Sequence, residues 1–257
     1  MQNKLKLYGF NNLTKSLSFN IYDICYAKTE REQKDYIAYI DKQYNSERLT
    51  SILEKVAYMI GANILSISKQ DYEPQGASVV ILISEENSRL SKKNHNDAVV
   101  AHLDKSHITV HTYPEYHPDK SIATFRVDID VATCGEISPL KTLDFLIGSF
   151  DSDIITMDYK VRGFTRDMQG NKVFLDDELN SIQQYINKET LKKYDAIDIN
   201  VYKSNIFHTK MLIRDLILQN YLFNSDIYEI NPQKRLQIEK NLREEMIEIF
   251  EGYNVYA

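Results

Sequence analysis

A helical spacing of apolar residues marks residues 46–60, which read SERLTSILEKVAYMI. Apolar side chains recur there every three or four positions, as the buried face of an amphipathic helix requires. Ser46 is expected as the N-cap of this helix, and Gly61 follows it as the C′ residue. The predicted buried face consists of Leu49, Ile52, Leu53, Val56, Ala57 and Ile60.

Shorter apolar runs predict strands. Residues 63–69 and 78–84 are two such runs, joined through a turn-rich segment at residues 72–76, which read YEPQG. Residues 85–98, in contrast, are polar and are expected to form an exposed loop. The two runs therefore predict a hairpin followed by a surface segment.

Strict alternation of side chains predicts further strands at residues 107–113 and 123–131. Residues 154–161 are typical of another strand. The first alternating segment divides its side chains between two faces, with Ile108, Val110 and Thr112 on one face and His107, Thr109, His111 and Tyr113 on the other. In the second, the inward residues are Phe125, Val127, Ile129 and Val131.

Two proline-marked helix starts complete the pattern. Ser138 and Pro139 are expected to open a helix that runs to about residue 150, and residues 231–232 open a charged helix that runs to about residue 251. Strands with hairpin-like connections and a few helices, without a regular βαβ rhythm, favour the α+β class. We expect a largely antiparallel sheet packed with helices, in a single domain over residues 1–257.

Composition excludes several classes of protein. The 257 residues carry a formal net charge of −6, so the whole-chain basic character of a nucleic-acid-binding protein is absent. Two cysteines cannot form a disulfide scaffold or a four-cysteine zinc site, and they fit a reducing, cytoplasmic compartment. No signal-peptide pattern, long membrane-spanning apolar run or Gly-rich phosphate loop is seen, so we expect no membrane partner.

Four of the six histidines fall within one short stretch, at His102, His107, His111 and His117. A metal site, solvated strand-edge histidines and a catalytic role are the three interpretations. His107 and His111 share a strand face but lie about 13 Å apart along a strand, which is too far for one ion. The other two interpretations stay open on this evidence.

The two cysteines differ in context. Cys25 lies between Ile24 and Tyr26 and is expected in the core, whereas Cys134 sits where a strand ends and a helix is expected to follow. Cys134 is either an inert small residue or a functional thiol, and a thiol that is protonated at neutral pH can act as an acid. An acyl-transfer pair of Cys134 with His111 is conceivable but has no local sequence signature.

Three motifs in order carry a specific resemblance: PQGAS at residues 74–78, DKSHITVHTYPE at 104–115 and TCG at 133–135. Together they resemble the motifs of the S-adenosylmethionine decarboxylase proenzymes. Residues 9–26 and 162–167 are similar to the longer bacterial form of that family. The resemblance extends through nearly the whole chain, with its core at about residues 46–180.

The resemblance implies that the chain cuts itself between Lys105 and Ser106, giving a β chain of residues 1–105 and an α chain of residues 106–257. The Ser106 hydroxyl attacks the Lys105 carbonyl to give an ester, and loss of the Ser106 α-proton breaks the ester by β-elimination. The resulting dehydroalanine tautomerises and loses ammonia on hydrolysis, which leaves a pyruvoyl group. This ketone forms a Schiff base with the substrate amine and withdraws electrons as CO₂ leaves.

The resemblance also assigns roles to three other residues. His111 matches the proton acceptor in processing, which suits an imidazole that is largely neutral at pH 7. Ser78 matches a residue that assists processing by bonding the oxyanion, although a strand serine bonded to backbone is the alternative. Cys134 matches the proton donor in decarboxylation. Because Ser106 and His111 have opposite parity in an ideal strand, we expect a bend or bulge at Ser106 that brings them together.

Substrate recognition follows from the same resemblance. Glu115 matches a carboxylate that holds the ribose hydroxyls, Tyr72 is expected to stack on adenine, and Tyr113 offers an aromatic face to the sulfonium. Glu115 and Tyr72 could instead be ordinary surface turn residues. The longer bacterial form is associated with stimulation by magnesium and with assemblies of four α and four β chains. No metal-ligand cluster in the sequence locates such an ion.

Three functional hypotheses result. The first is a pyruvoyl-dependent carboxy-lyase that decarboxylates S-adenosylmethionine and so supplies the aminopropyl donor for spermidine synthesis. The second is the same chemistry on ornithine or arginine, because the ketone acts only at the amino acid α-carbon. The third is an uncleaved scaffold or regulatory partner, which would leave Ser106, His111 and Cys134 idle.

Overall fold

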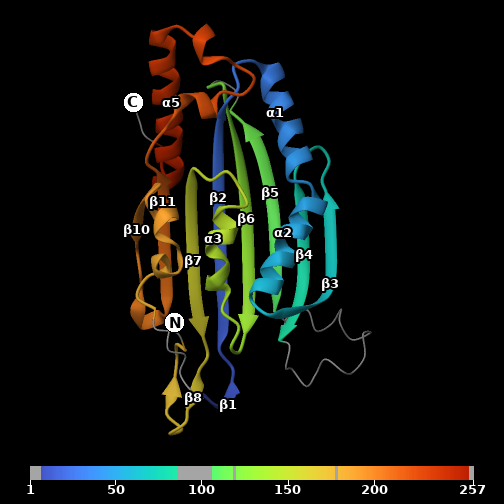
Figure 1. Cartoon of the computed structure of the whole chain (residues 1–257), viewed down its shortest axis with the longest axis vertical. Coiled ribbons are helices and arrows are strands. Elements are labelled where there is room, and N and C mark those ends of the chain that lie inside the picture. The colour runs from blue at the N-terminus through green and yellow to red at the C-terminus, as the bar shows by residue number, and fades with distance from the viewer. Residues whose placement is uncertain (1–6, 86–105, 118–119, 177–178, 255–257) are drawn as a thin grey trace.

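An eight-stranded sheet forms the body of the structure, a computed structural model that describes residues 7–85, 106–117, 120–176 and 179–254 (Figure 1). The strand order is β10-β11-β7-β2-β6-β5-β4-β3, and every neighbouring pair is antiparallel. This confirms the predicted α+β class with a largely antiparallel sheet. The strands are β2 (Thr14–Tyr26), β3 (Ala62–Asp71), β4 (Ala77–Glu85), β5 (His107–Tyr116), β6 (Ile122–Cys134), β7 (Ile154–Arg162), β10 (Tyr194–Asp198) and β11 (Ile206–Ile213).

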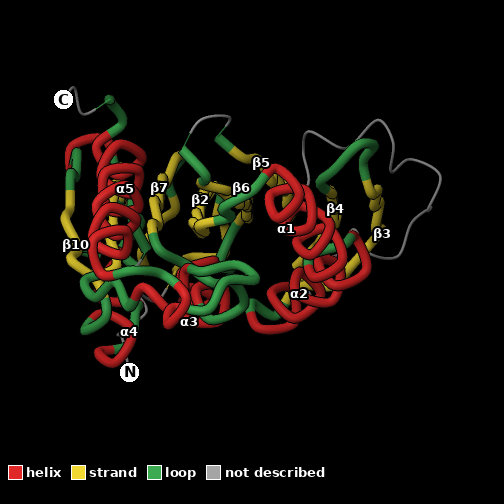
Figure 2. Tube along the Cα trace, turned by 90° about the horizontal axis from the view of Figure 1, so that it is seen from above, coloured by secondary structure: helices red, strands yellow, loops and turns green. Residues whose placement is uncertain are grey.

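Three helices lie along one face of the sheet, as Figure 2 shows: α1 (Glu30–Gln43), α2 (Ser46–Met59) and α3 (Leu143–Ile147). A short α4 (Lys188–Leu191) precedes β10, and the long α5 (Pro232–Glu251) follows the last strand. Short 3-10 helices occur at Pro139–Thr142, Ile182–Tyr185, Tyr202–Ser204, Leu218–Tyr221 and Ile227–Glu229.

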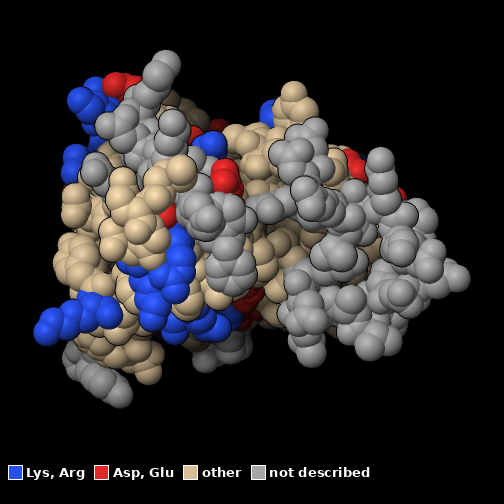
Figure 3. Space-filling view, turned by 90° about the horizontal axis from the view of Figure 1, so that it is seen from below, with Lys and Arg blue, Asp and Glu red and all other residues tan. Residues whose placement is uncertain are grey.

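A small sheet of β1 (Leu7–Asn11), β8 (Thr165–Asp167) and β9 (Lys172–Val173) extends from one end of the large sheet, at the bottom of Figure 1. Arg166 and Lys172 both lie over the ring of Phe164 here, at 5.7 and 5.2 Å from its centroid. Seen from below, Lys and Arg side chains gather on this side of the molecule (Figure 3). This end is therefore locally basic although the chain is acidic overall.

The two faces of the large sheet have different chemistry. Along β5, Ile108, Val110 and Thr112 are buried against the helices, whereas His111 is partly exposed on the opposite face, as the alternation predicts. On that opposite face, hydrogen bonds join side chains of neighbouring strands, from Ser18 to Asp130 and from Asn20 to Asp128. One face is therefore the hydrophobic core and the other is a polar surface.

Helix α5 covers the upper end of the polar face and forms a second, smaller core there. Its apolar side chains pack where β2, β6 and β7 present apolar instead of polar residues. Below this point the face carries partly exposed side chains such as Asp128 and His111. The second core includes Ile238, Leu242, Met246 and Phe250 of α5 with Ile24, Ile122 and Ile154 of the strands.

Two predicted helix starts differ from the structure. Asn45, not Ser46, caps α2, because Asn45 Oδ1 accepts the Arg48 N–H at 2.9 Å while Ser46 Oγ donates to Asp71 at 2.9 Å.

The helix expected at residues 139–150 is a 3-10 turn followed by the short α3, which ends at Ile147. Ser138 makes no capping hydrogen bond, and Thr142 Oγ1 instead donates to Pro139 O at 2.7 Å. Most of the expected loop at residues 85–98 lies outside the described residues.

A buried ion pair connects the central strand to the segment after β9. Lys15 Nζ lies 2.6 Å from Asp176 Oδ2, and the two side chains are 0% and 2% exposed. Lys15 is on β2 and is paired with Thr133 and Val161 of the flanking strands. The pair therefore joins residues 161 positions apart in sequence, on a central strand and close to the end of the sheet where β6 finishes.

A second buried charge lies where β7 begins. Asp153 Oδ2 accepts the Ile24 N–H at 2.8 Å, and Asp153 Oδ1 accepts the Tyr221 hydroxyl at 2.7 Å. Burial raises the pKa of Asp153 to about 6 despite these bonds. Burial, and then the charge of Asp153, raise the pKa of nearby Asp23 well above its usual range. Both carboxyls are therefore easier to protonate in the folded chain than in the unfolded chain.

We predict that Asp176→Ala lowers the free energy of unfolding by about 3–5 kcal/mol, because it leaves the Lys15 ammonium buried without a partner. Urea unfolding at neutral pH measures this change. The double variant Lys15→Met/Asp176→Leu should recover most of the loss. Lys34→Ala, which breaks the exposed Lys34–Glu30 pair, is the control and should leave the free energy of unfolding nearly unchanged. A loss below about 1 kcal/mol for Asp176→Ala would contradict the prediction.

The second prediction concerns pH. An unfolded Asp has a pKa of about 3.9, so between about pH 4 and pH 6 the folded chain binds more protons at Asp153 than the unfolded chain does. The free energy of unfolding should therefore fall as pH rises through this window, by roughly 2–3 kcal/mol from Asp153.

Asp153→Asn should remove that part of the slope, because an amide does not titrate. The Tyr221 hydroxyl keeps a partner in this variant, since it can still bond the amide. Urea unfolding of both proteins at several pH values tests this, and any slope that remains in the variant comes from other titrating groups, among them Asp23, Asp41 and Glu115, whose pKa values burial also raises. Identical slopes in wild type and variant would refute the assignment.

Candidate active site

Ser106 and Cys134 meet at the lower end of the sheet. Ser106 directly precedes β5 and Cys134 is the last residue of β6, and antiparallel pairing brings the two ends together (Figure 1). The Cys134 backbone N–H donates to Ser106 Oγ at 3.1 Å, and Ser106 O accepts the Ile83 N–H at 2.9 Å. Ser106 is 7% exposed, whereas the Cys134 thiol is free and exposed. Lys105 lies outside the described residues.

A tight turn fixes the backbone around Cys134. The buried Thr133 donates its hydroxyl to Ile137 O at 3.0 Å, and the Gly135 N–H donates to Leu13 O at 2.9 Å. Gly135 has a φ of +67°, a conformation that suits glycine. The sequence Thr-Cys-Gly therefore holds the Cys134 N–H in place for Ser106.

His111 and Ser78 form a second group higher on the sheet. The register pairs Ser78 of β4 with His111 of β5, and His111 with Asp128 of β6, so the three lie in one row across the polar face. Tyr72 Oη lies 3.5 Å from His111 Nδ1, and the Tyr113 ring is nearly parallel to that of His111 at an angle of 19°. Tyr72 thus contacts His111 from the turn between β3 and β4.

Asp128 of this row, and Arg126 beside it in the row of Tyr113, were not identified from the sequence. Arg126 binds Asp128 through both Nε, at 2.7 Å, and Nη2, and its guanidinium lies 5.2 Å from the Tyr113 ring centroid. Asn20 also donates to Asp128 Oδ1 at 2.5 Å. The signal is present in the alternation of residues 123–131, because side chains that alternate with the buried Phe125 must face the polar side.

The structure does not bring Ser106 and His111 together within one chain. From His107 to Tyr116, β5 pairs with β6 without a register shift, so the expected bend does not occur between residues 107 and 111. Five residues of strand separate Ser106 from His111 by roughly 16 Å. The two groups are therefore distinct: Ser106 with Cys134, and His111 with Ser78.

Glu115 lies at the other end of β5. Nine strand residues place it roughly 30 Å from Ser106, and it is paired with Thr124 near α5. Burial, and then the charge of Glu245 on α5, raise the pKa of the Glu115 carboxyl above its usual value. Lys120 Nζ lies 3.5 Å from Glu245 and partly balances this charge. Glu115 and Ser106 of the same chain cannot contact one small substrate molecule.

The remaining candidates have structural partners. His117 Nδ1 accepts the Lys120 N–H at 3.1 Å. His208 of β11, which lies outside that stretch of histidines, also has a partner, because its Nδ1 lies 2.8 Å from Asp158 on the neighbouring strand. Cys25 is 8% exposed, and burial raises the pKa of its thiol, which makes it unreactive. His102 lies outside the described residues. Within the described ranges, no three His, Cys, Asp or Glu side chains are arranged to hold a metal ion, so no ligands for magnesium can be named.

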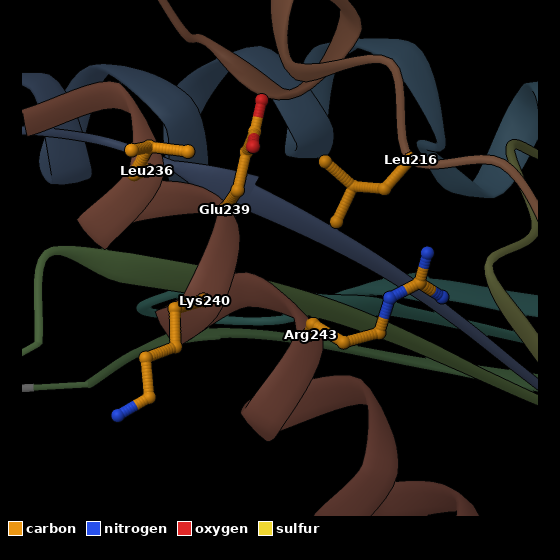
Figure 4. A pocket seen from close by; sticks show the side chains of 5 residues that line it. All are labelled: Leu216, Leu236, Glu239, Lys240 and Arg243. Atoms are coloured by element: carbon orange, nitrogen blue, oxygen red, sulfur yellow. The ribbon is translucent and has the colours of Figure 1, made fainter. Parts of the chain in front are cut away.

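A pocket of about 320 Å³ lies away from these groups, between α5 and the segment after β11. Arg243 extends toward the Leu216 segment and donates to Ile213 O at 3.1 Å, while Lys240 points in another direction (Figure 4). The two cations therefore do not converge on one ligand. The pocket is lined by Leu216, Leu236, Glu239, Lys240 and Arg243.

None of the helices among the described residues has the length and apolarity needed to cross a membrane.

Two solved structures are similar to parts of the chain. The adenosylmethionine decarboxylase from Aquifex aeolicus is 18% identical, with a TM-score of 0.33, over 66% of this chain and 100% of that one. The Trypanosoma brucei AdoMetDC-delta26 monomer is 14% identical, with a TM-score of 0.38, over 78% of this chain and 66% of that one.

Full-length relatives are far more similar. An S-adenosylmethionine decarboxylase proenzyme of Clostridium botulinum (strain Eklund 17B / Type B) is 70% identical and covers 100% of this chain and 98% of its own length. Proteins of the same name from Clostridium beijerinckii and Halorhodospira halophila are 69% and 58% identical, over 100% and 99% of this chain and 99% and 97% of their own lengths. A family model for S-adenosylmethionine decarboxylase matches residues 37–163. Because such identity extends over whole chains, this chain belongs to the S-adenosylmethionine decarboxylase family.

Proposed function

We propose that this chain decarboxylates S-adenosylmethionine with a ketone that it makes from its own Ser106. The observation that carries the proposal is the contact of Ser106 with Cys134 at one end of the sheet, in a chain whose full-length relatives are named S-adenosylmethionine decarboxylase proenzymes. The product would supply aminopropyl groups for spermidine synthesis. Ornithine or arginine is the alternative substrate, but no contact among the described residues favours either of these two amino acids.

The residues at this end suit a ketone at position 106. Ser106 is nearly buried, and the backbone N–H of Cys134 points at its side chain. At this position a pyruvoyl group supplies a carbonyl that captures the substrate amine and withdraws electrons as CO₂ leaves. Cys134 carries an exposed thiol on the residue whose backbone N–H bonds Ser106, and the turn at Gly135 fixes the backbone there. Cys134 is the proposed proton donor to the substrate carbon.

Self-cleavage requires a nucleophile, an oxyanion donor and a base. The Ser106 hydroxyl attacks the Lys105 carbonyl, and the hydrogen bond from the Cys134 N–H orients the Ser106 oxygen. His111 is the proposed base that removes the Ser106 α-proton as the ester bond breaks. Ser78 lies directly opposite His111 and is the proposed donor to the oxyanion.

The separation of the two groups indicates how the site is completed. A histidine side chain cannot span the roughly 16 Å of regular strand between His111 and Ser106. His111 and Cys134 both lie on the polar face of the sheet, whose lower part is partly exposed. We therefore propose that two copies of the chain pack face to face here, so that His111 and Ser78 of one copy serve Ser106 of the other. A two-fold axis would then create two identical sites.

Such a dimer would be one unit of the assembly of four α and four β chains expected from the sequence. Tyr72 and Tyr113 lie beside His111 and would face the same shared space, where their rings could contact the adenine or the sulfonium of the substrate. Glu115 lies farther along β5 beside α5, and we assign it no contact with substrate bound to Ser106 of its own chain.

We predict that active protein runs as two fragments on a denaturing gel. The intact mass of the α fragment should be lower, by one ammonia, than simple hydrolysis at Lys105–Ser106 would give. Ser106→Ala should remain one chain and lose all turnover, whereas Ser66→Ala, on the exposed strand β3, should be cut and active. A single uncut band in active protein, or activity in Ser106→Ala, would rule out the proposed function. Release of labelled CO₂ from S-adenosylmethionine, ornithine and arginine in parallel identifies the substrate.

The face-to-face arrangement predicts complementation between two inactive variants. His111→Ala alone should stay uncut, because it lacks the base, and Ser106→Ala alone should stay uncut, because it lacks the nucleophile. When the two are co-expressed with different tags, the His111→Ala chain should be cut in mixed dimers, because its partner supplies His111. Gel analysis after tandem-tag purification measures this. If mixed dimers form but stay uncut, His111 acts within its own chain and the arrangement is wrong.

A further inference from the structure

We infer that Tyr72 is a positioning residue for self-cleavage: its hydroxyl holds His111 Nδ1, so that the other ring nitrogen, Nε2, is presented as the base. The inference rests on the proposed role of His111. Tyr72 Oη lies 3.5 Å from His111 Nδ1, the outer limit of a hydrogen bond. Catalytic hydrogen bonds are often this long before the reacting complex forms.

The turn that carries Tyr72 is held firmly against β5 and α1. The Tyr72 N–H donates to Gly76 O at 2.8 Å, and the Gly76 N–H donates to Asp41 Oδ1 on α1 at 2.9 Å. Gly76 has a φ of +92°, and a Cβ at this position would lie 2.6 Å from Thr112 O. Only glycine fits so close to the residue that follows His111.

Two further bonds connect the same turn to β5. Gln75 Nε2 donates to Pro114 O at 2.6 Å, and the Ala77 N–H donates to Thr112 Oγ1 at 2.7 Å. Because these contacts lie on the residues just beyond His111, they fix the backbone of the turn that carries Tyr72 relative to the strand that carries His111. The Tyr72 hydroxyl is therefore placed by the fold and not by a flexible loop.

The other polar neighbours leave His111 Nδ1 to Tyr72. Asp128 is the register partner of His111 on β6, but its carboxylate is bound by Arg126 on two sides and by Asn20. Among the described residues, Tyr72 is the hydrogen-bonding partner within reach of a His111 nitrogen. The titratable or charged groups that face His111 are thus Tyr72 from the turn, Tyr113 from β5, and Arg126 and Asp128 from β6.

The chemistry of imidazole gives the hydroxyl its effect. Neutral histidine has one N–H and one ring nitrogen with a free lone pair, and a tyrosine hydroxyl can accept from the first or donate to the second. When Nδ1–H donates to Tyr72 Oη, the lone pair is on Nε2, ready to accept the Ser106 α-proton. After that transfer both nitrogens carry protons, and the same oxygen still accepts from Nδ1. Tyr72 therefore stabilises the base most when it is protonated.

Tyr72→Phe tests the inference, because it removes the hydroxyl and keeps the ring. Radiolabelled chain made by cell-free translation is chased without substrate, and the fraction cut is measured on gels between pH 5.5 and pH 9. We expect cleavage about 10-fold slower, the effect of one lost hydrogen bond, and the midpoint of the pH–rate profile at a lower pH. Tyr58→Phe, at an 84% exposed tyrosine on α2, is the control and should match wild type.

Each outcome decides a separate question. A wild-type rate in Tyr72→Phe overturns the inference, and so does a slower rate with an unchanged midpoint, because a purely structural defect would lower the rate at all pH values alike. His111→Ala is measured in parallel. If His111→Ala is cut normally, the proposed function of His111 fails. If His111→Ala is uncut while Tyr72→Phe behaves as wild type, only the role of Tyr72 fails. Because no substrate is present, any contact of the Tyr72 ring with adenine does not affect the result.

Discussion

The register of β5 between β4 and β6 is the constraint on which the candidate site depends. It aligns Ser78, His111 and Asp128 in one row, and it brings Ser106 to Cys134 at the end of the same strands. Side chains alternate along a strand, so a slip of one residue would turn His111 into the core and Val110 to the surface. The buried apolar residues of β5 therefore fix the position of its polar residues, and the hydrophobic face determines the geometry of the chemical face.

Local patterns predict those parts of the fold in which one face is apolar without interruption. The strands at residues 107–113 and 123–131 and helix α2 occur where the spacing of apolar residues places them, and helix α5 begins at the Asn-Pro start signal of residues 231–232. The central strand β2 was missed, although it is the longest partner of β6. Its buried Leu17, Phe19 and Ile21 alternate with polar residues, so the strand pattern itself is present in the sequence, but the same face contains Lys15, whose partner Asp176 lies 161 residues away. No local pattern contains that information.

The same limit applies to the site. The resemblance identified Ser106, His111 and Cys134 as candidates, but their arrangement depends on strand register. The expectation of a bend at Ser106 assumed that Ser106 and His111 of one chain must meet. The strand is regular over residues 107–111, so no bend there brings the two residues together. Glu115 and Tyr72 depend on still longer connections, since α5 covers the end of β5 and a turn bound to α1 holds Tyr72.

The path of the chain through the sheet has a consequence for the two fragments that a cut after Lys105 would create. The first fragment would contain β2, β3 and β4 of the large sheet. However, β2 lies between β6 and β7 of the second fragment, and β4 pairs with β5, which also belongs to the second fragment. Lys15 and Asp176 would stand on opposite sides of the cut. Strands of the two fragments would thus alternate in one sheet, and the fragments could separate only if the hydrogen bonds of the central strands were broken. Cutting the chain would create a new N-terminus at Ser106, where β5 begins, while the strand pairing that holds the subunit together would be the same as in the uncut chain.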